Sequence, residues 1–408
     1  MFITKTLNIP LFFKFIHIIH TLIIVIKLNF KLLYIGDKTM HFKIKRVKLL
    51  NALAKAARAV SIRSPLPVLT GVKFDLKNNQ LILTGSDSDI TIQTVIEADD
   101  DLIVYESGAV VLNSRYILDI VRKIDSDEIE IEIIDGLLTR IKGNHIEFNL
   151  NGTDAIEYPR IDLSKTGTHF MLNSLTLKNI ISETKFAASD KETRPILTGI
   201  NFKAHDQHLE CIATDSYRLA KKIIDLDEDI TFNITIPKLS LDEISKIIEK
   251  DEMIELYVSD RKVLFVFDNN IIQTRLIDGN YPDTSRLIPS QFDYSLNINK
   301  MDLINAIERV SLLLSEQNNI IKLEMSDENV VLSSYQQEIG SVEEILNTSF
   351  YKGEPLSISF SSKYANDAIK SFNGEKIKIL FTGEMKPFIV KDQEKNDLLQ
   401  LVLPVRTY

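Results

Sequence analysis

The sequence predicts an α+β fold of three tandem domains of similar size, each with two helices packed on small antiparallel sheets. The first observation is a repeat: PVLTGVKF at 67–74 returns as PILTGINF at 195–202, an offset of 128 residues (195 − 67). A second landmark, EYPRI at 157–161, is echoed by NYPD at 280–283, an offset of 123 residues (282 − 159). Two landmarks repeating at one period indicate that one domain type occurs at least twice. The length of 408 residues allows roughly two to four domains of ~100–200 residues.

The first repeat places two helices among short strands. Apolar residues follow one helical face over 45–60, and the prolines of the loop 61–67 end that helix. Alternation of apolar and polar residues predicts strands at 72–76, 80–84 and 90–96, with a hairpin turn at Asn78-Asn79. A second helix at 115–124 precedes strands that are joined by turns at Asp135-Gly136 and Gly143-Asn144. These last strands are predicted at 128–134, 137–142 and 145–149.

The second and third repeats follow the same plan. In the second we expect helices at 174–189 and 238–250, and strands at 200–203, 210–214, 254–258, 262–267 and 271–277. In the third, which lacks the LTG landmark, we expect helices at 300–315 and 363–370, and strands at 320–325, 330–334, 376–381 and 399–403. Each small sheet needs a helix to cover its apolar face, which gives an α+β layer arrangement.

The predicted boundaries are an extension at 1–39 and domains at 40–166, 167–292 and 293–408. The extension contains an apolar run of 12 residues, 15–26, between Lys14 and Lys27, which is shorter than the ~20 residues of a spanning helix. A membrane anchor or signal-like segment is one interpretation. We favour the other, that translation starts at Met40 and that the extension is a non-native start or disordered.

The composition indicates a cytoplasmic protein without a membrane partner. Apolar residues make up 44% and charged residues 26% of the chain, as in proteins with packed cores. The single cysteine, Cys211, excludes an intrachain disulfide and suits a reducing compartment. The net charge of −9 argues against a protein that coats nucleic acid over its whole surface.

The six predicted helices carry a charge opposite to that of the rest of the chain. They contain 17 Lys and Arg but 8 Asp and Glu, whereas the whole chain has a net charge of −9. If these helices shared one surface, it would attract a phosphate backbone without reading its sequence. The alternative is that each helix simply presents a solvated face.

No motif for catalysis, a cofactor or a metal is apparent. The segment 85–89 (GSDSD) lacks the spaced ligands and closing Glu of a calcium loop. Its counterpart in the second repeat, 213–216 (ATDS), indicates a turn at the end of a strand. His205 and His208 are too few for a zinc site and flank a predicted hairpin at Asp206-Gln207. Phosphate-binding glycine loops and nucleophile motifs are also missing from the sequence.

Three motifs together resemble the bacterial sliding clamp family, the beta subunit of DNA polymerase III. They are ATDSYRLA at 213–220, DGNYPD at 278–283 and LPVR at 403–406, and the match runs in order from Met40 to Tyr408. The resemblance implies a non-catalytic processivity factor whose head-to-tail homodimer closes as a ring around duplex DNA. It also implies a clamp loader, the polymerase III alpha subunit and other proteins with a clamp-binding motif as partners.

The resemblance also implies a partner-peptide groove between the second and third domains. Arg218 and Arg406 are expected to be available for polar or terminal groups of the peptide, and aliphatic residues to take its apolar anchors. Two departures from the family pattern, Ser216-Tyr217 for Gly-His and the additional Tyr408, could change peptide preference. The expected groove residues are Leu197, Thr214, Ser216, Tyr217, Arg218, Leu219, Pro282, Arg286, Leu287, Leu401, Val402, Leu403, Pro404, Val405 and Arg406.

For the dimer interface, the family pattern points to Phe148 and Leu150 of the first domain and to Leu312 and Leu313 of the third. An ordinary core position is the alternative for each. The residues expected to contact DNA are Arg63, Lys191, Arg194, Lys45, Arg46 and Arg115. Two other functions remain as alternatives: a monomeric nucleic-acid-binding or peptide-binding adaptor, and an enzyme of nucleotide or phosphate metabolism.

Overall fold

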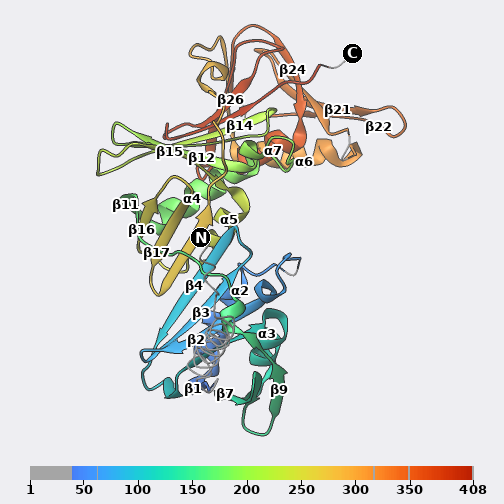
Figure 1. Cartoon of the computed structure of the whole chain (residues 1–408). Helices are drawn as coiled ribbons and strands as arrows, with labels where there is room; N and C mark the ends of the chain where they lie inside the picture. Colours follow the sequence, from blue (N-terminus) through green and yellow to red (C-terminus); the bar gives the residue numbers. More distant parts are fainter. Residues whose placement is uncertain (1–38, 62, 316–317, 348–349, 407–408) are drawn as a thin grey trace, which may run out of the picture. The chain divides into compact units, whose positions relative to one another are not determined.

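The computed structural model describes residues 39–61, 63–315, 318–347 and 350–406. The expectations for the extension, apart from Thr39, and for Tyr408 therefore lie outside the described residues. The described chain forms two compact units, shown in Figure 1. Unit 1 contains the residues up to Gly85 and Gln93–Arg160, and unit 2 contains Ser86–Ile92 and the residues from Ile161 onward.

Unit 1 holds the first predicted domain, with two helices and two sheets. The helices α2 (Arg46–Ala57) and α3 (Ser114–Lys123) pack against each other. One sheet has the strand order β5-β1-β7-β8-β9, and the other runs β10-β6-β2-β3-β4. The strands of unit 1 are β1 (His41–Lys45), β2 (Gly71–Lys77), β3 (Gln80–Ser86), β4 (Ile90–Glu97), β5 (Leu102–Glu106), β6 (Gly108–Asn113), β7 (Glu128–Asp135), β8 (Leu138–Lys142), β9 (Glu147–Asn151) and β10 (Thr153–Asp154).

The turns of unit 1 follow from the residues predicted for them. Asn78 and Asn79 have φ of 52° and 61° and join β2 to β3, because asparagine tolerates the left-handed region that a tight hairpin needs. Asn113 caps α3, its side chain accepting a hydrogen bond from the backbone N–H of Tyr116. The apolar faces of both helices and both sheets form one buried core around Phe42 and Phe74.

Unit 2 contains the second and third domains, and their strands form three groups. The group β18-β17-β16-β11 lies in the second domain, and β22-β21-β20-β24 lies in the third. The order β15-β12-β13-β14-β27-β26-β25-β19-β23 crosses both domains. The helices are α4 (Ser174–Thr184), α5 (Lys238–Ile247), α6 (Lys300–Val310) and α7 (Ser362–Lys370). The strands are β11 (Thr168–Asn173), β12 (Gly199–His205), β13 (His208–Thr214), β14 (Arg218–Asp225), β15 (Phe232–Pro237), β16 (Met253–Val258), β17 (Lys262–Phe267), β18 (Asn270–Arg275), β19 (Tyr294–Asn299), β20 (Ile320–Met325), β21 (Val330–Gln336), β22 (Gly340–Ile345), β23 (Phe350–Lys352), β24 (Leu356–Ser361), β25 (Lys376–Phe381), β26 (Phe388–Asp392) and β27 (Leu398–Val402).

The second and third domains are joined by an antiparallel pair of strands, β14 and β27. Their register runs from Arg218 opposite Val402 to Lys222 opposite Leu398. Gln400 of β27 is fully buried, and its side-chain amide donates to the backbone oxygen of Glu183 on α4 at 2.9 Å. We call this pair of strands the seam, and it makes the two domains one compact unit.

The predicted α+β fold with two helices in each of three domains is confirmed within the described residues. The helix at 174–189 ends earlier than expected, at Thr184, and continues as a 3₁₀ turn over Lys185–Ala187. The helix at 300–315 likewise ends at Val310 and is followed by a 3₁₀ turn over Ser311–Leu313. None of the helices formed by the described residues is long and apolar enough to cross a membrane.

Candidate functional site

A tight turn between β13 and β14 begins the site. Ser216 has a φ of 80°, and its backbone N–H donates to Oγ1 of Thr214 at 3.1 Å. Oδ1 of Asp215 accepts from the backbone N–H groups of Tyr217 at 2.9 Å and Arg218 at 3.0 Å. These short side-chain bonds hold the turn in place of a regular strand ladder.

The first domain contains the same turn, as the repeat predicted. There Ser88 has a φ of 86°, and its N–H donates to Oγ of Ser86 at 3.2 Å. Oδ1 of Asp87 accepts from the N–H groups of Asp89 and Ile90, each at 2.9 Å. The interpretation of both acidic segments as strand-end turns is therefore confirmed.

Replacing Ser216 by glycine should raise the free energy of unfolding, because glycine adopts a positive φ without a Cβ clash. The relief is partly offset by glycine's greater freedom in the unfolded chain, so we expect a gain of up to about 1 kcal/mol. Urea unfolding of Ser216→Gly measures it. Ser88→Gly in the matching turn is the control and should give a similar gain. A loss of stability in Ser216→Gly alone would mean that the serine hydroxyl has a structural role there.

Arg218, which is predicted to contact the partner peptide, already has partners inside the fold. Its guanidinium is nearly buried and forms ion pairs with Asp215 at 3.1 Å and Asp367 at 2.6 Å. It also lies over the ring of Tyr364, 4.5 Å from the ring centroid. Its charge is compensated inside the fold, where Arg218 braces the turn. Arg406 is exposed.

Apolar residues form the floor of the site beside this turn. Ile212, Leu219 and Leu401 are buried together where β13, β14 and β27 meet. The partly buried residues packed against them are Tyr281, Ile288, Leu399 and Leu403. The Tyr281 hydroxyl accepts a hydrogen bond from the N–H of Thr214 at 3.0 Å, and burial raises its pKa well above the ordinary range. Tyr281 therefore remains a neutral part of this floor.

The rim of the site combines exposed side chains of the second domain with a partly buried tyrosine of the third. Tyr217 is 58% exposed and stacks on Tyr364 of α7, with their centroids 6.3 Å apart. Leu287 is 49% exposed, and Pro282 and Arg286 are exposed beside it in the chain. An aromatic pair above an aliphatic floor suits the anchor residues of a short peptide.

The C-terminal segment ties the two domains together at this rim. The N–H of Leu403 donates to the backbone oxygen of Tyr217 at 3.0 Å, and that of Val405 donates to Ser359 at 2.7 Å. Pro404 forms an isolated bridge with Phe360. Leu403, Pro404 and Val405 are partly exposed, whereas Leu401, Val402, Leu197, Thr214 and Leu219 are buried. We name the floor, the rim and this segment together the groove.

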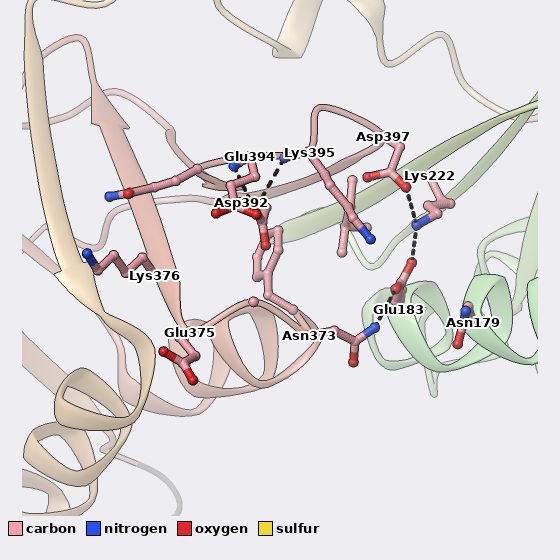
Figure 2. A pocket seen from close by; sticks show the side chains of 14 residues that line it. Asn179, Glu183, Lys222, Asn373, Glu375, Lys376, Asp392, Glu394, Lys395 and Asp397 are labelled. Atoms are coloured by element: carbon pink, nitrogen blue, oxygen red, sulfur yellow. Dashed lines mark hydrogen bonds and ion pairs between the residues drawn. The ribbon is translucent and has the colours of Figure 1, made fainter.

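The other end of the seam is held by a second set of charges. Figure 2 shows the ammonium group of Lys222 between the carboxylates of Glu183, at 2.7 Å, and Asp397, at 2.8 Å. Burial raises the pKa of Glu183, although Lys222 favours its ionised form. Burial alone would lower the pKa of Lys222, but its hydrogen bonds to Asp397 and Glu183 raise it. The hollow beside them, of about 610 Å³, is lined by charges of both signs.

Replacing Lys222 by methionine should lower the free energy of unfolding by about 3–5 kcal/mol, because Glu183 is left buried without its partner. The pKa of Glu183 then rises further above its unfolded value, so stability falls as pH rises through the folded pKa. The deficit in urea unfolding should be larger at pH 8 than at pH 5. Lys221→Met is the matched control, because Lys221 is more exposed and pairs with Glu210 on the neighbouring strand. Equal losses in both variants would contradict a special role for Lys222.

The residues predicted for the dimer interface lie on or near two edge strands. Phe148 and Leu150 are half-buried on β9, the last strand of its sheet. Leu312 is 79% exposed, and Leu313 is half-buried beside it. The sequence analysis missed β22, the edge strand of the third-domain sheet, which exposes Ile345. Its alternating sequence GSVEEI is the signal that could have found it.

Comparisons with known proteins agree over most of the chain. Models for the N-terminal, central and C-terminal domains of the DNA polymerase III beta subunit match residues 40–162, 171–283 and 285–406. The beta sliding clamp of Staphylococcus epidermidis is 42% identical over 376 residues, which cover 90% of this chain and all of that protein.

The chain belongs to the DNA polymerase III beta subunit family, the beta sliding clamps.

Solved clamps have the same fold. The Bacillus subtilis sliding clamp is 40% identical and superimposes with a TM-score of 0.87, covering 90% of this chain and all of that one. A Bartonella birtlesii clamp bound to griselimycin is 27% identical with a TM-score of 0.86 and the same coverage. The resemblance found in the sequence is therefore confirmed, and with it a non-catalytic processivity subunit of DNA replication. Among the described residues, no group of His, Cys, Asp and Glu could hold a metal ion.

The basic residues predicted to contact DNA differ in whether their side chains already have partners inside the fold. Lys45 ends β1 instead of beginning a helix, and its ammonium pairs with Asp101 at 3.1 Å. The side chain of Arg46 donates to the backbone oxygen of Ser126 at 3.1 Å. The other four are exposed and have no ion pair with another described residue. They are Arg63, Arg115, Lys191 and Arg194. These four have their full charge free for phosphate.

Several residues at the groove were not predicted. Tyr364, Asp367 and Phe186 come from α7 and the turn after α4, and they surround Arg218. Asp367 lies 149 residues after Arg218, and Phe186 lies 32 residues before it (218 − 186), so no local pattern links them. The seam brings them together, and a sequence that does not reveal the pairing of β14 with β27 cannot reveal these neighbours.

Proposed function

We propose that two copies of this chain close head to tail into a ring around duplex DNA, with β9 of one copy paired to β22 of the other. Both are terminal strands of their sheets, and an unpaired edge is a template for another strand. Apolar side chains accompany both edges: Phe148 and Leu150 on one, Leu312 and Ile345 on the other. Pairing these edges would bury the exposed Leu312, which costs free energy while it faces water.

The DNA contact in this proposal is made by exposed basic side chains on loops that the repeat makes equivalent. Arg63 precedes the first LTG landmark, and Lys191 and Arg194 precede the second. Arg115 begins α3. Contacts of this kind address phosphates and carry no sequence information, so the bound clamp can slide. Lys45 and Arg46, which already have internal partners, contribute less.

The groove takes a short linear peptide of a polymerase or another replication partner. The support is the apolar floor at Leu219 and Leu401 below the exposed rim at Tyr217 and Leu287. An apolar anchor of the peptide would enter the floor and displace water there, while Arg406 at the rim meets its polar groups. As a replication factor, the protein would act in the cytoplasm, on the cell's DNA.

Retention on circular DNA tests the ring. The clamp is incubated with nicked circular DNA, a clamp loader and ATP, and bound protein is measured before and after the DNA is linearised. A topological link predicts retention on circles and loss from linear ends, with little dependence on salt once the clamp is loaded. Equal retention on both forms, or on neither with an active loader, would instead support the monomeric adaptor. The loop residues are tested in parallel by the loading efficiency of an Arg63→Gln, Arg194→Gln variant.

A further inference from the structure

The first strand of each domain is followed directly by a helix, but only two of these three strands have neighbours on both sides. In the first domain, β1 pairs with β5 and with β7. In the third, β19 pairs with β23 and with β25. In the second domain, β11 pairs with β16 and is the last strand of its sheet among the described residues. The repeat therefore leaves one position empty in the second domain.

The segment that would fill this position forms no strand. β5 is the fifth strand of the first domain, and β23 is the fifth strand of the third. The corresponding part of the second domain is the stretch 226–231, between β14 and β15. The N–H of Leu226 donates to the backbone oxygen of Gln207 at 2.7 Å, as the N–H of Ala98 does to that of Asn79 at 2.8 Å in the first domain. Asp227, Glu228 and Asp229 follow and are exposed. Only six residues separate β14 from β15, whereas ten separate β4 from β6 and β22 from β24, so this stretch remains a loop.

The free edge lacks the features that usually protect an edge strand. The sequence of β11, THFMLN, contains neither a charged Lys, Glu or Asp nor a proline, although natural edges are commonly blunted by them. Met171 of β11 is 40% exposed, and Met253 of β16 is 49% exposed. Methionine is adaptable and suits a surface that accepts another chain.

A hollow adjoins this edge and has an acidic border. Its volume is about 700 Å³, and its lining includes Met171, Leu172, Ile223 and Leu226. Asp225 and Asp227 also line it, and Glu228 and Asp229 continue the acidic loop. Asp225 pairs with His208 at 2.8 Å. Asp227, Glu228 and Asp229 have no ion pair with another described residue.

We propose that β11 is a second docking site, which binds an extended, basic segment of a partner protein by strand addition. The backbone of that segment pairs with β11, and an apolar side chain enters the hollow next to Leu172 and Leu226. Its Lys or Arg residues meet Asp227, Glu228 and Asp229. Main-chain hydrogen bonds supply affinity in such complexes, and the alternating side chains supply specificity.

This site is separate from the groove. β14 begins at Arg218 beside the groove and ends at Asp225 beside the hollow. A strand of that length spans roughly 24 Å, so one peptide in the groove leaves β11 free. The two sites also differ in chemistry, since the groove has an aromatic and aliphatic rim and β11 has an acidic border. A ring could therefore hold two different partner segments on one subunit.

Hydrogen exchange on the full chain tests the proposal with two probe peptides of one length, KVKIKVK and EVEIEVE. The basic probe should slow exchange of the backbone amides in 168–173, whereas the acidic probe should not. Its affinity, measured by fluorescence anisotropy at low salt, should fall about tenfold in Asp227→Asn, Glu228→Gln, which removes two exposed charges. Asp327→Asn, Glu328→Gln is the matched control, with the same residue pair in an exposed turn of the third domain, and should bind like the parent.

Three results would overturn the proposal. Protection that appears at β9 or β22 and not at β11 would assign the probe to the ring edges. Equal weakening in the two double variants would mean that the basic probe responds to net charge alone. Association beyond the ring dimer in the absence of probe, lost in Met171→Lys, would make a second copy of this chain the occupant of β11.

Discussion

Leu312→Asp is expected to convert the dimeric ring into monomers. In the single chain Leu312 is 79% exposed, so the aspartate has no folding penalty until the edges meet. At the interface it would be a charge without a partner on an apolar surface. A loss of ~2 kcal/mol, typical of an interface hot spot, corresponds to roughly 30-fold in affinity. A ring has two such interfaces, so the dissociation constant should rise by roughly 1,000-fold.

Native mass spectrometry at a series of concentrations measures this change. Leu239→Asp is the matched control, because Leu239 is 75% exposed at the start of α5 and lies outside both edge strands. We expect that variant to remain a dimer. A dimer of unchanged affinity in Leu312→Asp would show that the closing surface does not include the 3₁₀ turn after α6.

Removing residues 403–408 is expected to abolish binding of a polymerase peptide while the dimer persists. The truncation removes part of the groove floor at Leu403, together with its backbone bond to Tyr217. It also removes Arg406 from the rim. Loss of several anchor contacts should lower peptide affinity by at least about 100-fold. The seam strand β27 ends at Val402 and is left intact.

Fluorescence anisotropy with a labelled clamp-binding peptide measures the affinity, and native mass spectrometry measures the dimer. Val405→Asp serves as a milder variant in which the backbone bond to Ser359 can still form. This variant should lower the affinity for the peptide without altering the thermal unfolding of the clamp. Parent-like affinity in the truncated chain would place the groove elsewhere on the clamp, whatever its effect on stability.

The repeated elements of the fold were predicted well from the sequence, because each copy of the repeat supports the assignment made for the other. The Asn78-Asn79 hairpin and the equivalent turns at Ser88 and Ser216 depend on local residues whose preferences are strong. Helices with a clear apolar face, such as α3, were found for the same reason. The predicted ends of α4 and α6 lay too far along the chain, because a 3₁₀ turn continues the apolar pattern beyond each helix.

What the sequence could not predict depends on pairings between distant segments. β14 reads RLAKKIID, and its two lysines obscure the alternation that would mark a strand. Lys222 is buried there between Glu183 of its own domain and Asp397, which meets it across the seam. The ion pair of Arg218 was not predicted for the same reason, since its partner Asp367 comes from another domain of the chain. Long-range charge compensation has no local signature, and it decides whether a basic residue is free.

The seam also has a mechanical consequence. β14 and β27 run antiparallel, and charged clusters fasten both ends, one at Arg218 and one at Lys222. A partner that pulls on the groove along these strands loads their hydrogen bonds in shear, so the bonds share the force and do not fail one after another. A peptide held by a few apolar anchors slips out at a smaller force. Under tension the clamp therefore releases its cargo before the second and third domains separate.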